Sequence, residues 1–195
     1  PVEVHLDGKP MAELYYPARL ELPAEPGEVR LTLFINGSPQ IVKMEIPEDD
    51  RDRLATWLAG DVPSPLEASE GSVVFGGTVE GTLVAGNVEV LRSLVGTADF
   101  PDLRGAILAL EEVGERPYRL DRALTHMLES GALRGVAGVV VGQLRGCVEP
   151  PTGGSQGVSA EQVIEDRLGR LGVPLVSGFP FGHDPKRNTP LGVGV

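Results

Sequence analysis

The fold is decided by the stretch Ala106-Ile-Leu-Ala-Leu-Glu-Glu-Val-Gly-Glu-Arg-Pro-Tyr-Arg-Leu-Asp-Arg-Ala-Leu-Thr-His-Met-Leu-Glu-Ser-Gly131. Its first residues, 106–110, form a short apolar run that predicts a buried strand. Pro117 suits the first position of a helix, and apolar residues then recur at the spacing of one helix face until Gly131. A second apolar run, 136–141, follows. This order predicts a βαβ unit of a parallel sheet.

Three carboxylates follow the first predicted strand of this unit. In parallel sheets, ligands and catalytic groups collect at the carboxyl ends of the strands. Glu111 continues the strand directly, so we expect it to be partly buried and to need a partner. A histidine would suit, because a buried carboxylate can orient an imidazole and stabilise its charged form. Glu112 and Glu115 are expected to be favourable charges at the helix entry.

Outward from this unit, the chain divides into two predicted domains. Residues 1–62 contain alternating apolar residues on either side of the turn Asn36-Gly37, followed by a short helix, and they predict a small β-rich module. The stretch 61–71 has two prolines and few apolar residues, which is typical of a linker. Residues 63–195 predict an α/β domain, in which Ser159 and Gln162 form the capping box of a further helix.

Composition argues against several classes of function. The chain has 28 acidic and 17 basic residues and a formal net charge of −11, with no Lys/Arg cluster, which argues against nucleic acid or an anionic membrane as partner. No window approaches the ~18 consecutive apolar residues of a membrane span. The single cysteine, Cys147, excludes an internal disulfide and fits a reducing cytoplasm. No metal is expected, because histidines and carboxylates show no short ligand spacing.

The candidate general base is His183. Of the three histidines, His5 and His126 fall in a predicted strand and a predicted helix, where surface positions are expected. His183 instead lies among glycines in the loop 178–184, and loops on a rigid scaffold often carry functional groups. Asn87 is expected to cap a helix, with substrate binding as the alternative role. No serine lies in a Gly-x-Ser-x-Gly turn, so the residues offer a base and an orienting acid without a nucleophile.

Four ordered blocks of the sequence resemble the LD-carboxypeptidase family. They are Gly81-Thr-Leu-Val-Ala-Gly-Asn-Val-Glu-Val-Leu91, Gly105-Ala-Ile-Leu-Ala-Leu-Glu-Glu-Val-Gly-Glu-Arg-Pro-Tyr-Arg-Leu-Asp-Arg-Ala-Leu-Thr125, the run 136–144, and Pro174-Leu-Val-Ser-Gly-Phe-Pro-Phe-Gly-His183 with Pro190-Leu-Gly192. Ala85 and Val88 depart from the family's first block. The resemblance covers roughly residues 70 to 195. It implies an α/β domain of the swivelling β/β/α type with a mixed sheet and flanking helices, preceded here by the β-rich module.

The resemblance also implies a chemistry. The family's glutamate corresponds to Glu111 and its histidine to His183, while its serine has no counterpart and residues 1–62 do not resemble the serine-bearing domain. We therefore expect the C-terminal domain of a serine-type LD-carboxypeptidase, whose N-terminal domain lies outside this chain. Such an enzyme releases a terminal D-amino acid from murein tetrapeptide, or a related peptide amide, in the cytoplasm without a cofactor. A homodimer is an expectation from the family alone.

Two alternatives remain open from the sequence. The chain could be a non-catalytic peptide-binding or interaction module that retains the fold without the nucleophile. In a third hypothesis, Cys147 or a serine of the N-terminal segment replaces the missing serine. The sequence does not assign a role to residues 1–62.

Overall fold

The computed structural model describes residues 2–6, 9–14, 18–22, 28–35, 38–45, 48–59, 63, 65–66, 72–150, 157–184 and 186–193. The predicted turn at 36–37 and most of the predicted linker lie outside these residues. The chain divides into two compact units. The first comprises Pro1–Pro65 together with Pro185–Pro190, and the second comprises Leu66–Asp184 together with Leu191–Val195.

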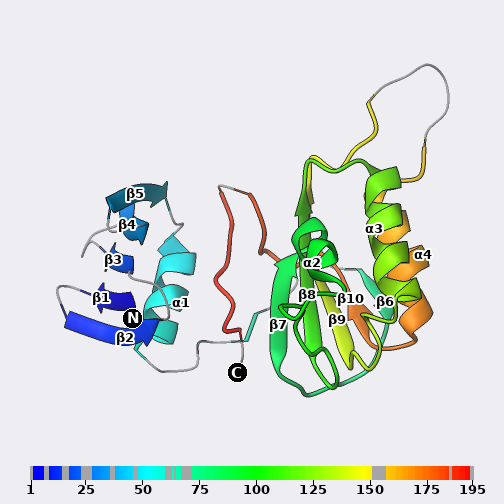
Figure 1. The fold of residues 1–195 in the computed structure, drawn as a ribbon, viewed down its shortest axis with the longest axis horizontal. Coiled ribbons are helices and arrows are strands. Elements are labelled where there is room, and N and C mark those ends of the chain that lie inside the picture. The colour runs from blue at the N-terminus through cyan, green and yellow to red at the C-terminus, as the bar shows by residue number, and fades with distance from the viewer. Residues whose placement is uncertain are drawn as a thin grey trace. The chain divides into compact units, whose positions relative to one another are not determined.

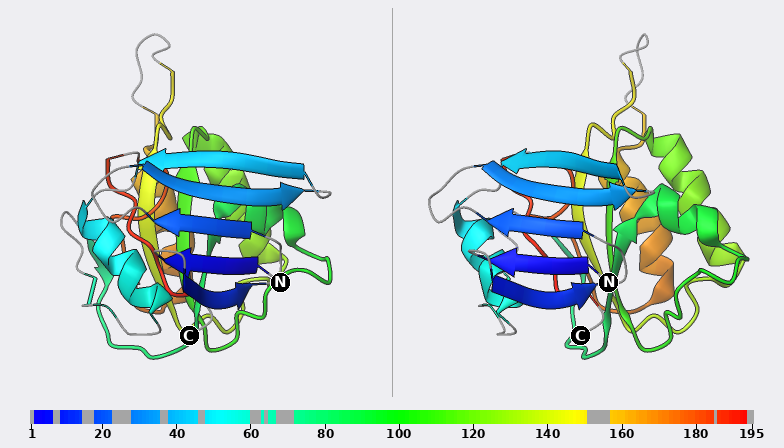
Figure 2. Two further views of the ribbon diagram at one scale, coloured as in Figure 1. Left: turned by 90° about the vertical axis from the view of Figure 1, so that its left-hand side faces the viewer. Right: turned by 60° about the vertical axis from the view of Figure 1, so that its left-hand side comes forward.

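The first unit contains a five-stranded sheet of order β2-β1-β3-β4-β5 and one helix, α1. The elements are β1 (Val2–Leu6), β2 (Lys9–Leu14), β3 (Ala18–Leu22), β4 (Glu28–Ile35), β5 (Ser38–Glu45) and α1 (Glu48–Leu58). Figure 2 shows this sheet with its strands across the view. Strands β4 and β5 pair antiparallel along their full length, as the alternating pattern predicted. The β-rich module expected from the sequence is therefore present.

The second unit contains a mixed five-stranded sheet of order β6-β10-β9-β8-β7. Its elements are β6 (Val73–Phe75), β7 (Leu83–Asn87), α2 (Val88–Leu94), β8 (Ile107–Val113), α3 (Pro117–Glu129), β9 (Gly138–Arg145), α4 (Ala160–Leu168), a 3-10 turn (Gly169–Leu171) and β10 (Leu175–Val176). Strands β7, β8, β9 and β10 are parallel to one another, and β6 pairs antiparallel with β10. The predicted fold class, an α/β domain with a mixed sheet and flanking helices behind a β-rich module, is confirmed.

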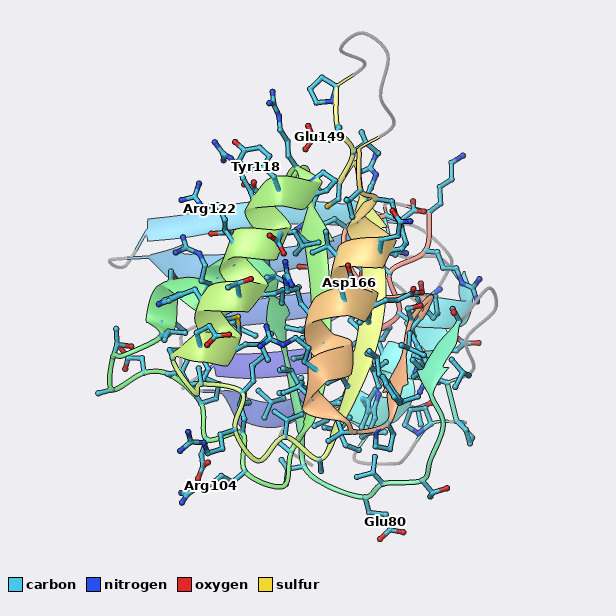
Figure 3. The ribbon with its side chains drawn as sticks, turned by 90° about the vertical axis from the view of Figure 1, so that its right-hand side faces the viewer. Glu80, Arg104, Tyr118, Arg122, Glu149 and Asp166 are labelled. Atoms are coloured by element: carbon cyan, nitrogen blue, oxygen red, sulfur yellow. The ribbon has the colours of Figure 1, made fainter. Side chains whose placement is uncertain are left out.

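Helices α2, α3 and α4 lie side by side on one face of this sheet (Figure 1). Helix α3 begins at Pro117 and buries the apolar stripe that its spacing predicted, including Leu120 and Leu124. Figure 3 shows α3 and α4 in front of the sheet, with Arg122 on α3 and Asp166 on α4 among the exposed side chains. The core between helices and sheet also contains Leu108, Leu110, Val139, Val141, Ile164 and Leu168.

Local signals set the ends of these helices. The Ser159 side chain accepts a hydrogen bond from the Gln162 backbone N–H at 3.2 Å, and Gln162 Oε1 accepts one from the Ser159 N–H at 2.9 Å, which is the predicted capping box. Gly131 follows α3 with φ +76°, a conformation that a glycine adopts without the steric cost of a Cβ. A capping box therefore marks the beginning of α4, and a glycine with positive φ follows the end of α3.

Candidate active site

The end of strand β8 carries Glu111 at an irregularity of the sheet. In the pairing of β8 with β9, Leu110 lies opposite Val141 and Glu112 lies opposite Leu144. One residue of β8, Glu111, therefore faces two residues of β9, which is the pattern of a β-bulge. Bulges bend a strand and redirect side chains, and they are frequent beside active sites.

The histidine loop, residues 177–184, is held along strand β9. The Phe179 backbone N–H donates to the Val141 carbonyl at 3.2 Å, and the Gln143 N–H donates to the Phe181 carbonyl at 2.9 Å. The Gln143 side chain then accepts a hydrogen bond from the Asp184 N–H at 2.8 Å. The loop thus runs alongside β9 and is hydrogen-bonded to it.

Two further contacts fix the position of His183 itself. The Arg145 guanidinium donates to the His183 carbonyl oxygen at 3.0 Å. On the preceding residue, Gly182 has φ +137°, and a Cβ there would lie 3.1 Å from Gln143 and 3.3 Å from the Glu111 carboxylate. A glycine is therefore required for the loop to approach Glu111 this closely.

His183 and Glu111 are brought together, as the sequence predicted for their geometry. His183 Nδ1 lies 2.6 Å from Glu111 Oε2. The Glu111 side chain is 11% exposed and the imidazole 52% exposed. A mostly buried carboxylate thus holds one ring nitrogen, while the ring stays accessible to a reacting group. This arrangement favours the tautomer with the proton on Nδ1, which leaves Nε2 able to accept a proton.

Glu112 does not lie where the sequence predicted, and its assignment as a helix-entry charge before α3 was wrong. It belongs to β8, is 2% exposed, and points to the beginning of α2. Its carboxylate accepts hydrogen bonds from the Asn87 amide at 2.7 Å and from the backbone N–H groups of Glu89 at 3.0 Å and Val113 at 2.8 Å. Side chains alternate along a strand, so Glu112 points toward the helix layer, whereas its neighbour Glu111 points to the opposite face of the sheet.

Asn87 has the capping role that was its simpler interpretation. Its Oδ1 accepts a hydrogen bond from the Val90 N–H at 3.1 Å at the beginning of α2, while its Nδ2 group donates to Glu112. It also lies directly beside Glu111 in the pairing of β7 with β8. Its contact with a substrate stays a prediction.

Glu115, unlike Glu112, lies before α3 and forms an ion pair with Arg119 at 3.4 Å, as expected for a helix-entry charge.

The remaining candidates do not join the pair. Cys147 is 3% exposed, and burial raises the pKa of its thiol, which is the opposite of what an activated nucleophile needs. His126 is exposed on α3 and lines a hollow of about 680 Å³ between α2 and α3. The side chain of His5 lies outside the described residues. Within the part of the chain that the structure describes, no group of three or more His, Cys, Asp or Glu residues is arranged to hold a metal ion.

Sequence reasoning missed the residues that support the histidine loop, Gln143 and Arg145. A weak signal existed in Gly142, which interrupts the apolar run of β9, because a glycine inside a strand often marks a bulge or a close backbone approach. A Cβ on Gly142 would lie 2.4 Å from the Phe181 carbonyl oxygen.

None of the helices in the described residues has the length and apolar character needed to span a bilayer.

A family model described as the LD-carboxypeptidase C-terminal domain matches residues 80–195. The chain therefore belongs to the LD-carboxypeptidase family. Named members of this family are carboxypeptidases, which are hydrolases. A protein of Synechocystis sp. named as a carboxypeptidase is 43% identical over 137 residues, which cover 70% of this chain and 44% of that protein. The murein tetrapeptide carboxypeptidase of Pseudomonas aeruginosa is 32% identical over 148 residues, covering 72% of this chain and 46% of that enzyme.

Among solved structures, the muramoyltetrapeptide carboxypeptidase of Oxalobacter formigenes shares the fold with a TM-score of 0.56 and 24% identity. The likeness covers 91% of this chain and 55% of that one. The chain thus spans less than half the length of the two relatives above. The family match covers most of the second compact unit and also the segment Pro185–Pro190, which is assigned to the first unit.

Proposed function

We propose that residues 63–195 form the Glu/His-bearing domain of a serine-type LD-carboxypeptidase, and that residues 1–62 are a separate module. The observation that carries the proposal is the 2.6 Å contact between His183 Nδ1 and Glu111 Oε2, on a ring that is half exposed. A carboxylate at Nδ1 with an accessible Nε2 is what a triad needs from its acid and base. The nucleophilic serine would come from a domain outside this chain.

In the proposed reaction, His183 Nε2 accepts the proton of the serine hydroxyl as that oxygen attacks the scissile carbonyl carbon. His183 then gives the proton to the nitrogen of the leaving D-amino acid. The resulting acyl-enzyme is hydrolysed by water, with His183 acting again as base and then as acid. Glu111 orients the ring and stabilises its charged form in each step. These steps require neither a metal nor an organic cofactor.

The substrate we propose is a murein-derived peptide, with cleavage before a terminal D-alanine. Two relatives or structural neighbours are named for murein or muramoyl tetrapeptide carboxypeptidase activity. Asn87 lies beside Glu111 at the same edge of the sheet and is our candidate for contact with that peptide. We also propose a cytoplasmic location and a homodimer, as for the family. A net charge of −11 makes nucleic acid and anionic membranes poor partners.

The alternative is a peptide-binding module that does not cleave. It is favoured by one observation: among the described residues, the hydrogen bonds at the His183 side chain include Glu111 and no serine or threonine hydroxyl. In this alternative, Glu111 and His183 would hold a peptide by hydrogen bonding alone. Activity measured with a serine-bearing domain present separates the two functions.

The test joins the whole chain to the part of the P. aeruginosa relative that the match leaves uncovered, which we propose carries the nucleophilic serine. The fused protein is incubated with murein tetrapeptide, and released D-alanine is measured by mass spectrometry beside a calorimetric binding titration. We expect release that is lost in His183→Ala and retained in His126→Ala, the matched change at an exposed histidine of α3. Binding without release would favour the module, and release that survives His183→Ala would refute the proposed base.

A further inference from the structure

Arg145 places a cationic side chain beside the proposed base. It is the last residue of β9, and its guanidinium donates a hydrogen bond to the His183 carbonyl oxygen at 3.0 Å. This carbonyl and the imidazole belong to one residue, so the guanidinium lies within about one residue's length of the ring. Arg145 is exposed and the imidazole is half exposed, so both groups are open to solvent at the same edge of the sheet.

The backbone of Arg145 is held by the neighbouring strand. Arg145 lies opposite Val113 in the pairing of β8 with β9, and its carbonyl oxygen accepts a hydrogen bond from the Gly114 N–H at 2.9 Å. Gln143, two residues earlier on β9, also contacts the histidine loop, through the Asp184 N–H. Alternate side chains of a strand point to the same side. The guanidinium therefore extends from a well-anchored strand end toward the side where the histidine loop lies.

Most of the hydrogen-bonding capacity of this guanidinium is unused within the described part of the chain. A guanidinium stays charged in proteins and has five N–H donors, and the contact with His183 engages one of them. Among the ion pairs between described residues, none involves Arg145. The two carboxylates at the end of β8 have other partners, Glu111 at His183 and Glu112 at the beginning of α2. A carboxylate from outside the chain can therefore pair with Arg145.

A carboxypeptidase has to distinguish the last residue of a peptide from an internal one. The free carboxylate marks the last residue, and a planar guanidinium can bind it through two parallel hydrogen bonds. In that residue one Cα separates the carboxylate from the amide nitrogen that leaves. Since one residue spans about 3.8 Å between Cα atoms, a carboxylate held at Arg145 keeps the scissile bond close to the His183 ring.

We propose that Arg145 binds the terminal carboxylate of the peptide and thereby restricts cleavage to its last residue. This role is one of binding and specificity, and it rests on the proposed function of the domain. The hydrogen bond to the His183 carbonyl orients the guanidinium, and the remaining donors bind the substrate.

The first test is an NMR titration of the whole chain with N-acetyl-D-alanine and with its amide, following the Arg145 Nε–H signal. The acid should shift this signal and bind about 10- to 100-fold more tightly than the amide, because hydrogen bonds between charged groups are lost with the amide. Arg145→Gln should abolish the difference. The matched control is Arg122→Gln, a change at an exposed arginine of α3 (Figure 3), which should preserve it. Equal binding of acid and amide, or an unshifted Arg145 signal, would overturn the proposal.

The second test separates substrate binding from a purely structural role, using the fused protein and murein tetrapeptide with a free or an amidated terminal carboxylate. Arg145→Gln should raise KM for the free acid about 10- to 100-fold with kcat little changed, and Arg145→Lys should raise it less, because an ammonium retains the charge. If Arg145 only holds the loop, Arg145→Gln will instead lower kcat, move the His183 ring nitrogen shifts and affect both peptides equally, and the proposal is wrong. Absence of D-alanine release by the unsubstituted fused protein would count against the proposed function, whereas the titration needs no cleavage and decides the role of Arg145 by itself.

Discussion

Replacing Gly142 with alanine should displace the histidine loop without touching either Glu111 or His183. The added Cβ would lie 2.4 Å from the Phe181 carbonyl oxygen and 2.6 and 2.7 Å from its ring, against an ordinary contact of 3.4 Å or more. Strand β9 is central in its sheet and cannot yield easily, so the loop must retreat by about 1 Å.

The cost of this retreat follows from two losses. Overpacking of a dense interior costs about 1–3 kcal/mol, and the hydrogen bond from Gln143 N–H to the Phe181 carbonyl contributes about 0.5–1.5 kcal/mol. We therefore expect Gly142→Ala to lower the free energy of unfolding by about 1.5–4.5 kcal/mol. In any active assembly, moving His183 by about 1 Å should also lower the rate on the order of 10²-fold.

Urea unfolding of the whole chain measures the first effect, and the ring nitrogen shifts of His183 measure the second. The matched control is Gly76→Ala, because nothing lies within 4 Å of a Cβ at that position. It should change the free energy of unfolding by less than about 0.5 kcal/mol. A Gly142→Ala variant with the urea midpoint and His183 signals of the unsubstituted chain would refute the account of how β9 holds the loop.

Three further outcomes are expected from the second unit. Leu124→Ala empties a fully buried position of α3 and should cost about 2–5 kcal/mol in urea unfolding, whereas an effect below about 1 kcal/mol would mean that this helix is poorly packed. Glu112→Ala leaves the Asn87 amide and the Glu89 N–H without their acceptor, so it should cost about 1–3 kcal/mol and speed exchange of the Glu89 amide; a neutral effect would contradict the capping of α2 by β8. Cys147 should react slowly with a thiol reagent until the chain unfolds. Because burial raises its pKa above the ordinary value of about 9, the folded state retains the proton longer, and the stability that this contributes is lost as the pH rises above that value. Rapid labelling of Cys147 in the folded chain would contradict the burial of its thiol.

The spacing of apolar residues and the positions of helix-capping residues predicted most of the second unit. Pro117, Gly131 and the pair Ser159/Gln162 set helix ends that the structure reproduces, because capping depends on residues close together in the sequence. The apolar runs at 106–110 and 136–141 became the adjacent parallel strands β8 and β9. Such features are local, or follow from the restricted handedness of βαβ connections.

What the sequence could not provide depends on residues far apart in the chain. The sequence singled out Glu111 at the strand end, but it did not show that Glu112 belongs to the same strand. The alternation of side chains along the strand then directs one toward His183 and the other toward the beginning of α2. The bulge opposite Glu111 depends on how β9 pairs, which a single strand does not reveal. The Asp50 carboxylate accepts hydrogen bonds from a segment more than 130 residues away in the sequence, and no periodic pattern indicates such a contact.

The central claim is that Glu111 orients His183 for proton transfer to and from a serine supplied by another domain. The most direct measurement is the rate of D-alanine release by the fused protein and by its Glu111→Gln variant. Glutamine retains the shape of the side chain but cannot stabilise the imidazolium, so the rate should fall about 10³- to 10⁴-fold with binding of the peptide little changed. Equal rates for the two proteins would contradict the account, because the carboxylate would then have no part in the reaction.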